Sequence, residues 1–354
     1  MRLLLFNLAT DVDDPILGFT TRWIHALARR VEGIHVITMQ TGRVEVPENV
    51  RVYSVGKEKG YSEPHRAALF YRHLLRIPRE ERIDVCFSHM MPVFTILAAP
   101  VLKRKGIPII TWYAHRQVTW ILKLAHHLSD RMVSIDESSY RYRHDKFEPL
   151  GHGIDTSLFS PGNTHQDNPP LLLSVGRLSP IKDPITLIEA VHRLRQRGHA
   201  IRCILVGEAP VRDRAYAGRV RQRVRELGLE DAVQLVGAVS NDQVVHWYRR
   251  CFAHVNCSPA DHALDKAGLE AMACARLSLS STLGFQQTMG PWADCLLFQY
   301  GDASDLAEKL SMLLALPRRK VEQIGLDLCQ RTLQMHDLQS LAERLVKVFA
   351  QVRR

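Results

Sequence analysis

Two positively charged side chains stand at a spacing that suits a diphosphate. Arg177 and Lys182 follow the apolar run 171–175 and precede a helix that Asp183 can cap and Pro184 can open. An arginine offers phosphate oxygens a planar fork, and a lysine adds a compact point charge. Two solvated charges on a surface loop are the alternative interpretation, and the spacing alone leaves both open.

A second segment with chemical potential runs from Ser258 to Ala275, after the apolar run 252–256. We expect a helix to begin near Ala267, where free backbone N–H groups and the helix dipole favour an anion. Glu270 would lie one turn into that helix, where a carboxylate can accept hydrogen bonds from vicinal sugar hydroxyls. A solvent-facing glutamate is the alternative.

Other chemistries find little support in the sequence. Asp11-Val12-Asp13 has the form of a DxD metal motif, but it follows the first apolar run, and we interpret it as a polar loop. The chain contains no HExxH, CxxC or other zinc-ligand spacing, so we expect neither a metal site nor a cofactor. It also contains no GxGxxG, which weighs against a dehydrogenase.

The elements that must position these residues are short apolar runs separated by helical patterns. Such runs, buried on both faces, are typical of a parallel sheet with helical crossovers, and six in each half predict two Rossmann-like, doubly wound α/β domains. Ser240-Asn241-Asp242-Gln243 fits a helix capping box. The predicted strands are 2–6, 34–39, 50–55, 83–87, 107–112, 131–135, 171–175, 201–206, 232–236, 252–256, 276–280 and 295–298.

The richest turn-forming stretch, 160–170, separates the two sets of runs. We therefore predict an N-terminal domain over 1–165 and a C-terminal domain over 166–330. A helix follows over 331–354, where leucines recur at helical spacing, and it could cross back to the N-terminal domain.

Composition limits the possible partners and the compartment. The 354 residues include 47 Lys and Arg against 37 Asp and Glu, a net charge of +10 that favours anionic partners. The excess is not gathered in a basic tail, so we expect no nucleic acid. Seven scattered cysteines are typical of free thiols in a reducing compartment. The initial apolar run is too short for a signal peptide, so a cytoplasmic protein is expected.

The ordered set of motifs resembles the GT-B glycosyltransferases of family 4, which are retaining and use nucleotide sugars. Gly176-Arg177 and Lys182 match the family's G-R-(x)4-K stretch, and Leu269-Glu270-Ala271-Met272-Ala273 matches the end of its E-x7-E helix. Gly151-His152-Gly153-Ile154-Asp155 is similar to the family's G-[IV]-D segment. The resemblance covers nearly the whole chain, most specifically 150–300.

This resemblance implies roles for named residues. Arg177 and Lys182 would hold the donor's diphosphate and Glu270 its ribose, while the loops after Val206 and Val236 would contact the base. In the N-terminal domain His115 would lie near the reacting sugar, and Gly18 would let backbone N–H groups approach the phosphates. The implied catalytic residues are His115, Arg177 and Lys182, and the implied donor-binding residues are Gly18, Gly207, Glu208, Val239, His262, Asp265, Lys266, Ala267, Gly268, Leu269 and Glu270.

The chain departs from the family pattern at three places. His262 stands where the family has its first glutamate, and Asp265 with Lys266 could replace that residue. Ala275 stands in place of the helix glycine, and the N-terminal loop offers only Gly18. Because position 262 carries a histidine and no glutamate, a covalent sugar intermediate on that residue is excluded.

The stretch 64–79 mixes Arg and His with apolar residues at helical spacing. Such a helix can rest on an anionic membrane surface, as in family members with lipid-linked acceptors, although an ordinary helix with a solvated basic face is the favoured interpretation. The protein would then be peripheral at the inner face of the membrane.

These observations predict a metal-independent, retaining glycosyltransferase of the hexosyltransferase type. Its partners would be a nucleotide sugar and an acceptor glycan, lipid or small molecule, as in polysaccharide or glycolipid biosynthesis. A sugar-nucleotide epimerase on the same fold and a GT-B protein that only binds nucleotide sugar remain alternatives. An oxidoreductase is the weakest of them.

Overall fold

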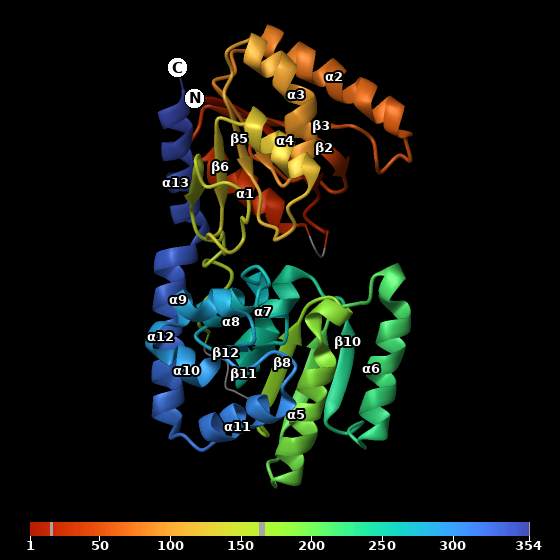
Figure 1. The fold of residues 1–354 in the computed structure, drawn as a ribbon, viewed down its shortest axis with the longest axis vertical. Coiled ribbons are helices and arrows are strands. Elements are labelled where there is room, and N and C mark those ends of the chain that lie inside the picture. Colours follow the sequence, from red (N-terminus) through yellow and green to blue (C-terminus); the bar gives the residue numbers. More distant parts are fainter. Residues whose placement is uncertain (15–16, 163–166, 354) are drawn as a thin grey trace. The chain divides into compact units, whose positions relative to one another are not determined.

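The computed structural model describes residues 1–14, 17–162 and 167–353, which form two compact units (Figure 1). Unit 1 comprises Met1–Gly153 and Leu338–Arg354, and unit 2 comprises Ile154–Asp337. The predicted boundary at 165–166 lies outside the described residues. The chain changes unit earlier because the residues after Gly153 bond within unit 2. Thr156 Oγ1, for example, donates to Asp337 Oδ1 at 2.6 Å.

Unit 1 is built on a seven-stranded parallel sheet with the order β3-β2-β1-β4-β5-β6-β7. All five residues of β4 are buried, as expected for a strand covered by helices on both faces. The elements are β1 (Arg2–Thr10), α1 (Phe19–Ala28), β2 (Gly33–Thr41), β3 (Val50–Ser54), α2 (Glu63–Glu80), β4 (Val85–His89), α3 (Pro92–Arg104), β5 (Ile109–Trp112), α4 (Trp120–Leu128), β6 (Arg131–Ser134), β7 (Phe147–Pro149) and α13 (Leu338–Val352).

Unit 2 is built on a five-stranded parallel sheet with the order β10-β9-β8-β11-β12. Its elements are β8 (Leu171–Val175), η1 (Pro180–Lys182), α5 (Pro184–Gln196), β9 (Arg202–Val206), η2 (Val211–Asp213), α6 (Arg214–Glu226), β10 (Val233–Gly237), α7 (Asn241–Arg250), β11 (Ala253–Asn256), α8 (Lys266–Ala273), β12 (Leu277–Ser280), η3 (Leu283–Phe285), α9 (Gln286–Met289), η4 (Gly290–Trp292), α10 (Ala293–Leu296), α11 (Ala303–Leu314) and α12 (Arg318–His336).

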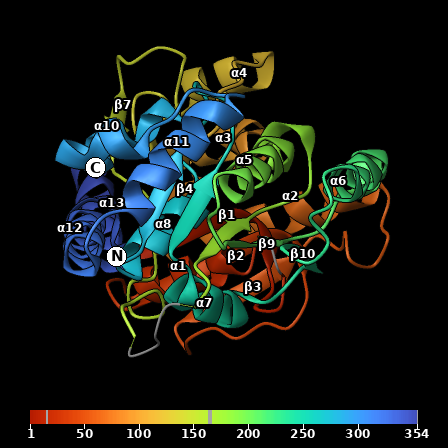
Figure 2. The ribbon, with the colours of Figure 1, turned by 90° about the horizontal axis from the view of Figure 1, so that it is seen from below.

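The crossover helices of unit 2 cover both faces of its sheet. Figure 2 shows α5 and α6 on one side of the strands and α7 and α8 on the other. Right-handed crossovers require this arrangement, because the chain adds strands first in one direction from β8 and then in the other. The predicted capping box is confirmed at the start of α7, where Ser240 Oγ accepts from the Gln243 N–H at 3.3 Å.

The strand predictions are confirmed except at the end of unit 2. The predicted strand 295–298 is wrong, because α10 occupies Ala293–Leu296 and only Leu297 makes an isolated bridge to Ser280. Strand β7 was not predicted, since its three residues include Glu148 and Pro149 and carry no apolar run.

The last helix, α13, belongs to unit 1. Arg30 donates to Gln339 and Glu343, each at 2.9 Å, and Arg344 donates to the Leu150 carbonyl at 2.9 Å. The Phe349 ring packs on Phe87 with centroids 5.3 Å apart. The chain therefore leaves unit 1 after Gly153 and returns to it at Leu338.

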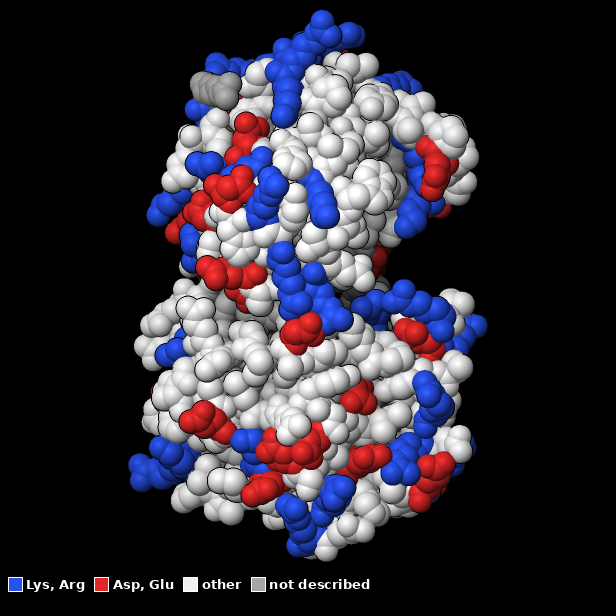
Figure 3. Space-filling view, viewed as in Figure 1, with Lys and Arg blue, Asp and Glu red and all other residues white. Residues whose placement is uncertain are grey.

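Basic and acidic side chains are interspersed on the face drawn in Figure 3, over both units. The positive net charge is thus spread over that face. Within the described part of the chain, no helix combines the length and the apolar character needed to cross a membrane. All seven cysteines are free thiols, as predicted.

Candidate active site

Arg177, Lys182 and Asp265 follow the two strands, β8 and β11, between which the strand order of unit 2 reverses. The chain adds β9 and β10 on one side of β8, and β11 and β12 on the other. Ligands of open α/β sheets bind outside the carboxyl ends of the strands at such a point. A pocket lies there, and its lining is Ser174, Val175, Gly176, Arg177, Leu178, Lys182, Pro184, Leu205, Val206, Val255 and Asn256.

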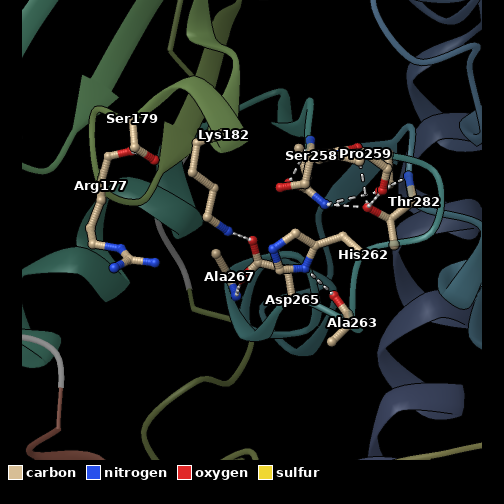
Figure 4. A network of polar contacts seen from close by, with 12 residues as sticks. Arg177, Ser179, Lys182, Ser258, Pro259, His262, Ala263, Asp265, Ala267 and Thr282 are labelled. Atoms are coloured by element: carbon tan, nitrogen blue, oxygen red, sulfur yellow. Dashed lines mark hydrogen bonds and ion pairs between the residues drawn. The ribbon is translucent and has the colours of Figure 1, made fainter. Parts of the chain in front are cut away.

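Arg177 and Lys182 both line this pocket, but their surroundings differ. The Arg177 side chain is exposed, and among the described residues it has no hydrogen bond or ion pair. The Lys182 side chain is only 18% exposed, and its ammonium forms an ion pair with Asp265 (Figure 4). Arg177 can therefore bind an anion from solution, whereas Lys182 already has an anionic partner in Asp265.

Asp265 connects the two segments that carry the candidate residues. It is the N-cap of α8, where its Oδ1 accepts from the Ala267 N–H at 3.2 Å, and its Oδ2 contacts Lys182. Burial on its own would raise the pKa of Asp265, but the charge and hydrogen bond of Lys182 lower it to about 2. The helix N–H groups proposed for an external anion are therefore partly satisfied by the chain's own carboxylate.

Glu270 is not solvent-facing. It is 8% exposed, and its Oε2 accepts a hydrogen bond from the fully buried Tyr248 Oη at 3.0 Å. Its Oε1 lies 3.9 Å from Lys266 Nζ. Burial, followed by the Glu270 charge, raises the pKa of Tyr248 well above its ordinary value, so this hydroxyl remains a donor.

The loop between β11 and α8 is fastened by short polar side chains (Figure 4). Asn256 Nδ2 donates to Ser280 Oγ at 3.1 Å, and Ser258 Oγ donates to Asn256 Oδ1 at 2.7 Å. Thr282 Oγ1 donates to the Pro259 carbonyl at 3.2 Å. His262, farther along the loop, is half-buried and has its Nδ1 3.1 Å from the Ala263 carbonyl oxygen.

The other residues assigned to the donor lie on neighbouring loops or inside α8. Gly207 and the exposed Glu208 follow β9, while the half-buried Val239 follows β10. Gly207 adopts φ +133°, and a Cβ there would lie 2.0 Å from the Gly176 carbonyl oxygen, so the loops after β8 and β9 require glycine at this contact. Ala267, Gly268 and Leu269 are buried in α8, with Gly268 packed against the Phe285 ring.

The two candidates in unit 1 lie at the carboxyl ends of its strands. His115 follows β5, is exposed, and accepts from the Gln117 N–H through Nδ1 at 3.2 Å. Gly18 precedes α1, and its N–H donates to the Asp14 carbonyl at 2.9 Å. Asp13 of the DxD-like loop is bound by Arg43 through hydrogen bonds of 2.7 and 2.8 Å.

Three buried residues that hydrogen-bond within these segments were missed in the sequence. Tyr248 of α7 donates to Glu270. Asn256 and His254, both in β11, hydrogen-bond to Ser280 and Ser278 of the neighbouring strand β12. Burial lowers the pKa of His254 to about 4, so it is neutral. A polar residue within an apolar strand, as in Ala253–Asn256, is a signal that could have indicated His254 and Asn256, but it does not extend to Tyr248 in α7.

Residues 169–315, which lie within unit 2, match the protein-family model described as Glycosyl transferases group 1. Over this range unit 2 is similar to the glycosyl transferases of group 1. The D-inositol 3-phosphate glycosyltransferase of Frankia alni is 27% identical over 186 residues, covering 49% of this chain and 46% of that protein. The enzyme of the same name from Kribbella flavida is 28% identical over 156 residues, 39% of this chain and 35% of that protein. The chain thus matches less than half the length of these relatives.

Solved structures extend the likeness in fold to the whole chain. Anabaena HepE in complex with UDP and glucose is 16% identical with a TM-score of 0.79, covering 99% of this chain and all of that one. Sucrose-phosphate synthase from Thermosynechococcus elongatus is 16% identical with a TM-score of 0.78, covering 99% of both chains. The predicted fold class, GT-B with two Rossmann-like domains, is confirmed.

Proposed function

We propose that the chain is a retaining glycosyltransferase that moves a sugar from a nucleoside-diphosphate sugar to an acceptor hydroxyl. The observation that carries the proposal is that Arg177 and Lys182 line the same pocket. This pocket lies where the strand order of unit 2 reverses, within the range that matches the group 1 model. The HepE structures in complex with UDP and with UDP-glucose support a donor of this class.

The proposed reaction breaks the bond between the anomeric carbon and the donor phosphate oxygen and forms one to the acceptor oxygen. The bonding electrons leave with the diphosphate, whose growing charge Arg177 and Lys182 would stabilise in place of a metal. The acceptor hydroxyl would lose its proton to a leaving phosphate oxygen on the same face of the sugar. Such a route retains the configuration of the anomeric carbon, and it does not require a carboxylate at position 262, where this chain has a histidine.

Incubation with UDP-glucose, GDP-mannose and ADP-glucose, with and without sugar and lipid acceptors, tests the activity. Nucleotide release that depends on an acceptor supports the transferase. Release of UDP without acceptor indicates the epimerase, and binding without turnover indicates a protein that only binds the nucleotide sugar. Unchanged turnover in EDTA is expected if the two side chains take the place of a metal.

Removal of either cation gives a first prediction. Arg177→Ala and Lys182→Ala should each lower kcat/KM at least ~100-fold, because a charge that stabilises the leaving group is lost. Arg195→Ala is the matched control, since Arg195 pairs with Asp231 at the far end of α5. Full turnover in both pocket variants would refute the diphosphate role.

The membrane contact proposed for 64–79 falls on α2, whose buried face is Phe70, Leu74 and Ile77. Its other face exposes Arg72 and Arg79, with Leu75 37% exposed. We predict that Arg72→Glu with Arg79→Glu weakens binding to phosphatidylglycerol vesicles, measured by co-sedimentation, at least ~30-fold, because each basic residue near the surface contributes about 1 kcal/mol. Arg221→Glu with Arg225→Glu on α6 makes the same charge change elsewhere. Equal losses in both pairs would contradict a specific role for α2.

A further inference from the structure

The ion pair between Lys182 and Asp265 joins the two halves of the candidate diphosphate site. The Lys182 stem runs along Gly176, where a Cβ would lie 3.4 Å from Lys182 Cε, and its ammonium reaches a carboxylate 83 positions away in the sequence. The side chains are 18% and 15% exposed, so both charges are largely removed from water. Figure 4 shows the contact beside His262, with Arg177 apart from it.

The Asp265 carboxylate uses the same donors that a phosphate group would use. One oxygen faces a lysine ammonium, and the other accepts an N–H from the first turn of a helix. Ammonium groups and helix N-termini both bind phosphate in proteins. A second anion near Asp265 would meet a like charge, and of the two cations that line the pocket only Arg177 has no ion pair among the residues described.

Building on the proposed function, we propose that Asp265 occupies the place of a donor phosphate and must be exchanged for it. The incoming diphosphate takes Lys182 from Asp265, and the carboxylate remains the N-cap of α8 through Ala267. The freed oxygen then needs a new hydrogen-bond donor, because a buried carboxylate without one is costly. A hydroxyl of the donor's sugar supplies it.

This exchange makes Asp265 a residue that distinguishes donor from spent nucleotide. A nucleotide sugar brings both a diphosphate for Lys182 and a hydroxyl for Asp265. A nucleoside diphosphate or inorganic pyrophosphate brings a diphosphate for Lys182 but no transferable sugar whose hydroxyl could reach Asp265. The Asp265 carboxylate then lies beside the negatively charged diphosphate without a new donor. The pair therefore weakens binding of the spent nucleotide more than binding of the donor, and it favours release of the nucleotide after transfer.

Isothermal titration of the full chain with UDP, GDP, ADP, pyrophosphate and the corresponding nucleotide sugars tests this role. Asp265→Asn keeps a good N-cap and removes the charge. It should bind the nucleoside diphosphate and pyrophosphate at least ~5-fold more tightly than the wild type, as expected from removing a like charge a few ångströms away. Affinity for the nucleotide sugar should change less, so the preference for the donor shrinks.

Two further variants define the comparison. Asp231→Asn removes the same charge and breaks the Asp231–Arg195 pair at the other end of α5, and it should bind every ligand as the wild type does. Asp265→Glu keeps the charge, so it should retain weak binding of the nucleoside diphosphate, and it serves if the asparagine variant does not fold.

The outcomes separate this inference from the proposed function. If the wild type binds none of these diphosphates or nucleotide sugars, the proposed function fails and the exchange fails with it. If the wild type binds but Asp265→Asn gains no affinity for the nucleoside diphosphate, or Asp265→Glu gains as much as Asp265→Asn, the exchange alone is overturned.

Discussion

A buried ion pair such as Lys182–Asp265 does not by itself make a fold more stable. Removing two charges from water costs several kcal/mol for each ion, and their attraction and hydrogen bonds must offset that cost. Here the carboxylate has a second partner in the Ala267 N–H, so each of its two oxygens has a hydrogen-bond donor. In the proposed exchange, the diphosphate takes Lys182 from this carboxylate, which keeps its hydrogen bond to Ala267.

The acid sensitivity of this pair can be predicted with its sign. The folded-state pKa of Asp265 is about 2, below its ordinary value of 3.8, so its contribution to stability is present above pH 3.8 and is lost as the pH falls through 2. Asp265→Asn should be less stable than the wild type, and the difference should shrink by about 1 kcal/mol between pH 5 and pH 3.

Urea unfolding of both proteins at the two pH values, followed by circular dichroism, measures this difference. Asp231→Asn controls for the change of residue type, because Asp231 is exposed and paired with Arg195. A difference between wild type and Asp265→Asn that is constant or grows toward pH 3 would show that the carboxylate is not held ionised by Lys182.

At the level of residues, the sequence was informative where chemistry follows strand ends. Arg177 and Asp265 could be placed on neighbouring loops, because both follow buried parallel strands. The contact of Lys182 with Asp265 could not be predicted, since it depends on the side-chain conformations of segments distant in the sequence. Tyr248 and its bond to Glu270 were missed for the same reason.

Among the elements, the turns after β8 and β9 carry the tightest backbone contact near the pocket. The Gly176 N–H donates to the Val206 carbonyl at 2.9 Å, and the Gly207 N–H donates to the Gly237 carbonyl at 2.7 Å. These bonds join three neighbouring strand ends into one rim. Because Gly207 lies so close to the Gly176 carbonyl, any side chain there must displace the loop that carries Arg177.

We therefore predict that Gly207→Ala destabilises unit 2 and weakens binding of the nucleotide sugar. Gly228→Ala is the matched control, because Gly228 also has a positive φ, +62°, but a Cβ there would meet nothing within 4 Å. The control should lose roughly 1–2 kcal/mol from backbone strain alone. Thermal unfolding and nucleotide titration of both variants give the comparison, and equal effects would contradict the close contact.

Apolar runs predicted most of the strands because parallel strands covered on both faces must be apolar throughout. The same rule fails at 295–298, where an apolar run forms a short helix and a single bridge beyond β12. A run of four residues carries no period that separates a strand from a buried helix. The edge strand β7, with Glu148 and Pro149, gives no apolar signal at all.

For the whole molecule, alternation of strands and helices was enough to predict two Rossmann-like domains. It could not assign the last helix, since an amphipathic pattern says that a face is buried but not against which partner. The hydrogen bonds of Arg30 and Arg344 make that assignment to unit 1. Unit 1 is consequently built from both ends of the chain.

This arrangement makes the integrity of unit 1 depend on the end of the chain. Phe349 is fully buried against Phe87, so Phe349→Ala should destabilise unit 1 by about 3–5 kcal/mol, the usual cost of emptying an aromatic site. Leu326→Ala on α12 removes an exposed side chain in unit 2 and should change the free energy of unfolding by less than about 0.5 kcal/mol.

Hydrogen exchange read by mass spectrometry shows which unit Phe349→Ala destabilises. Amides of α1 and β1 should exchange faster in Phe349→Ala, whereas those of β8 and α8 should match the wild type. Faster exchange in α8 with α1 unchanged would mean that the last helix supports unit 2 instead.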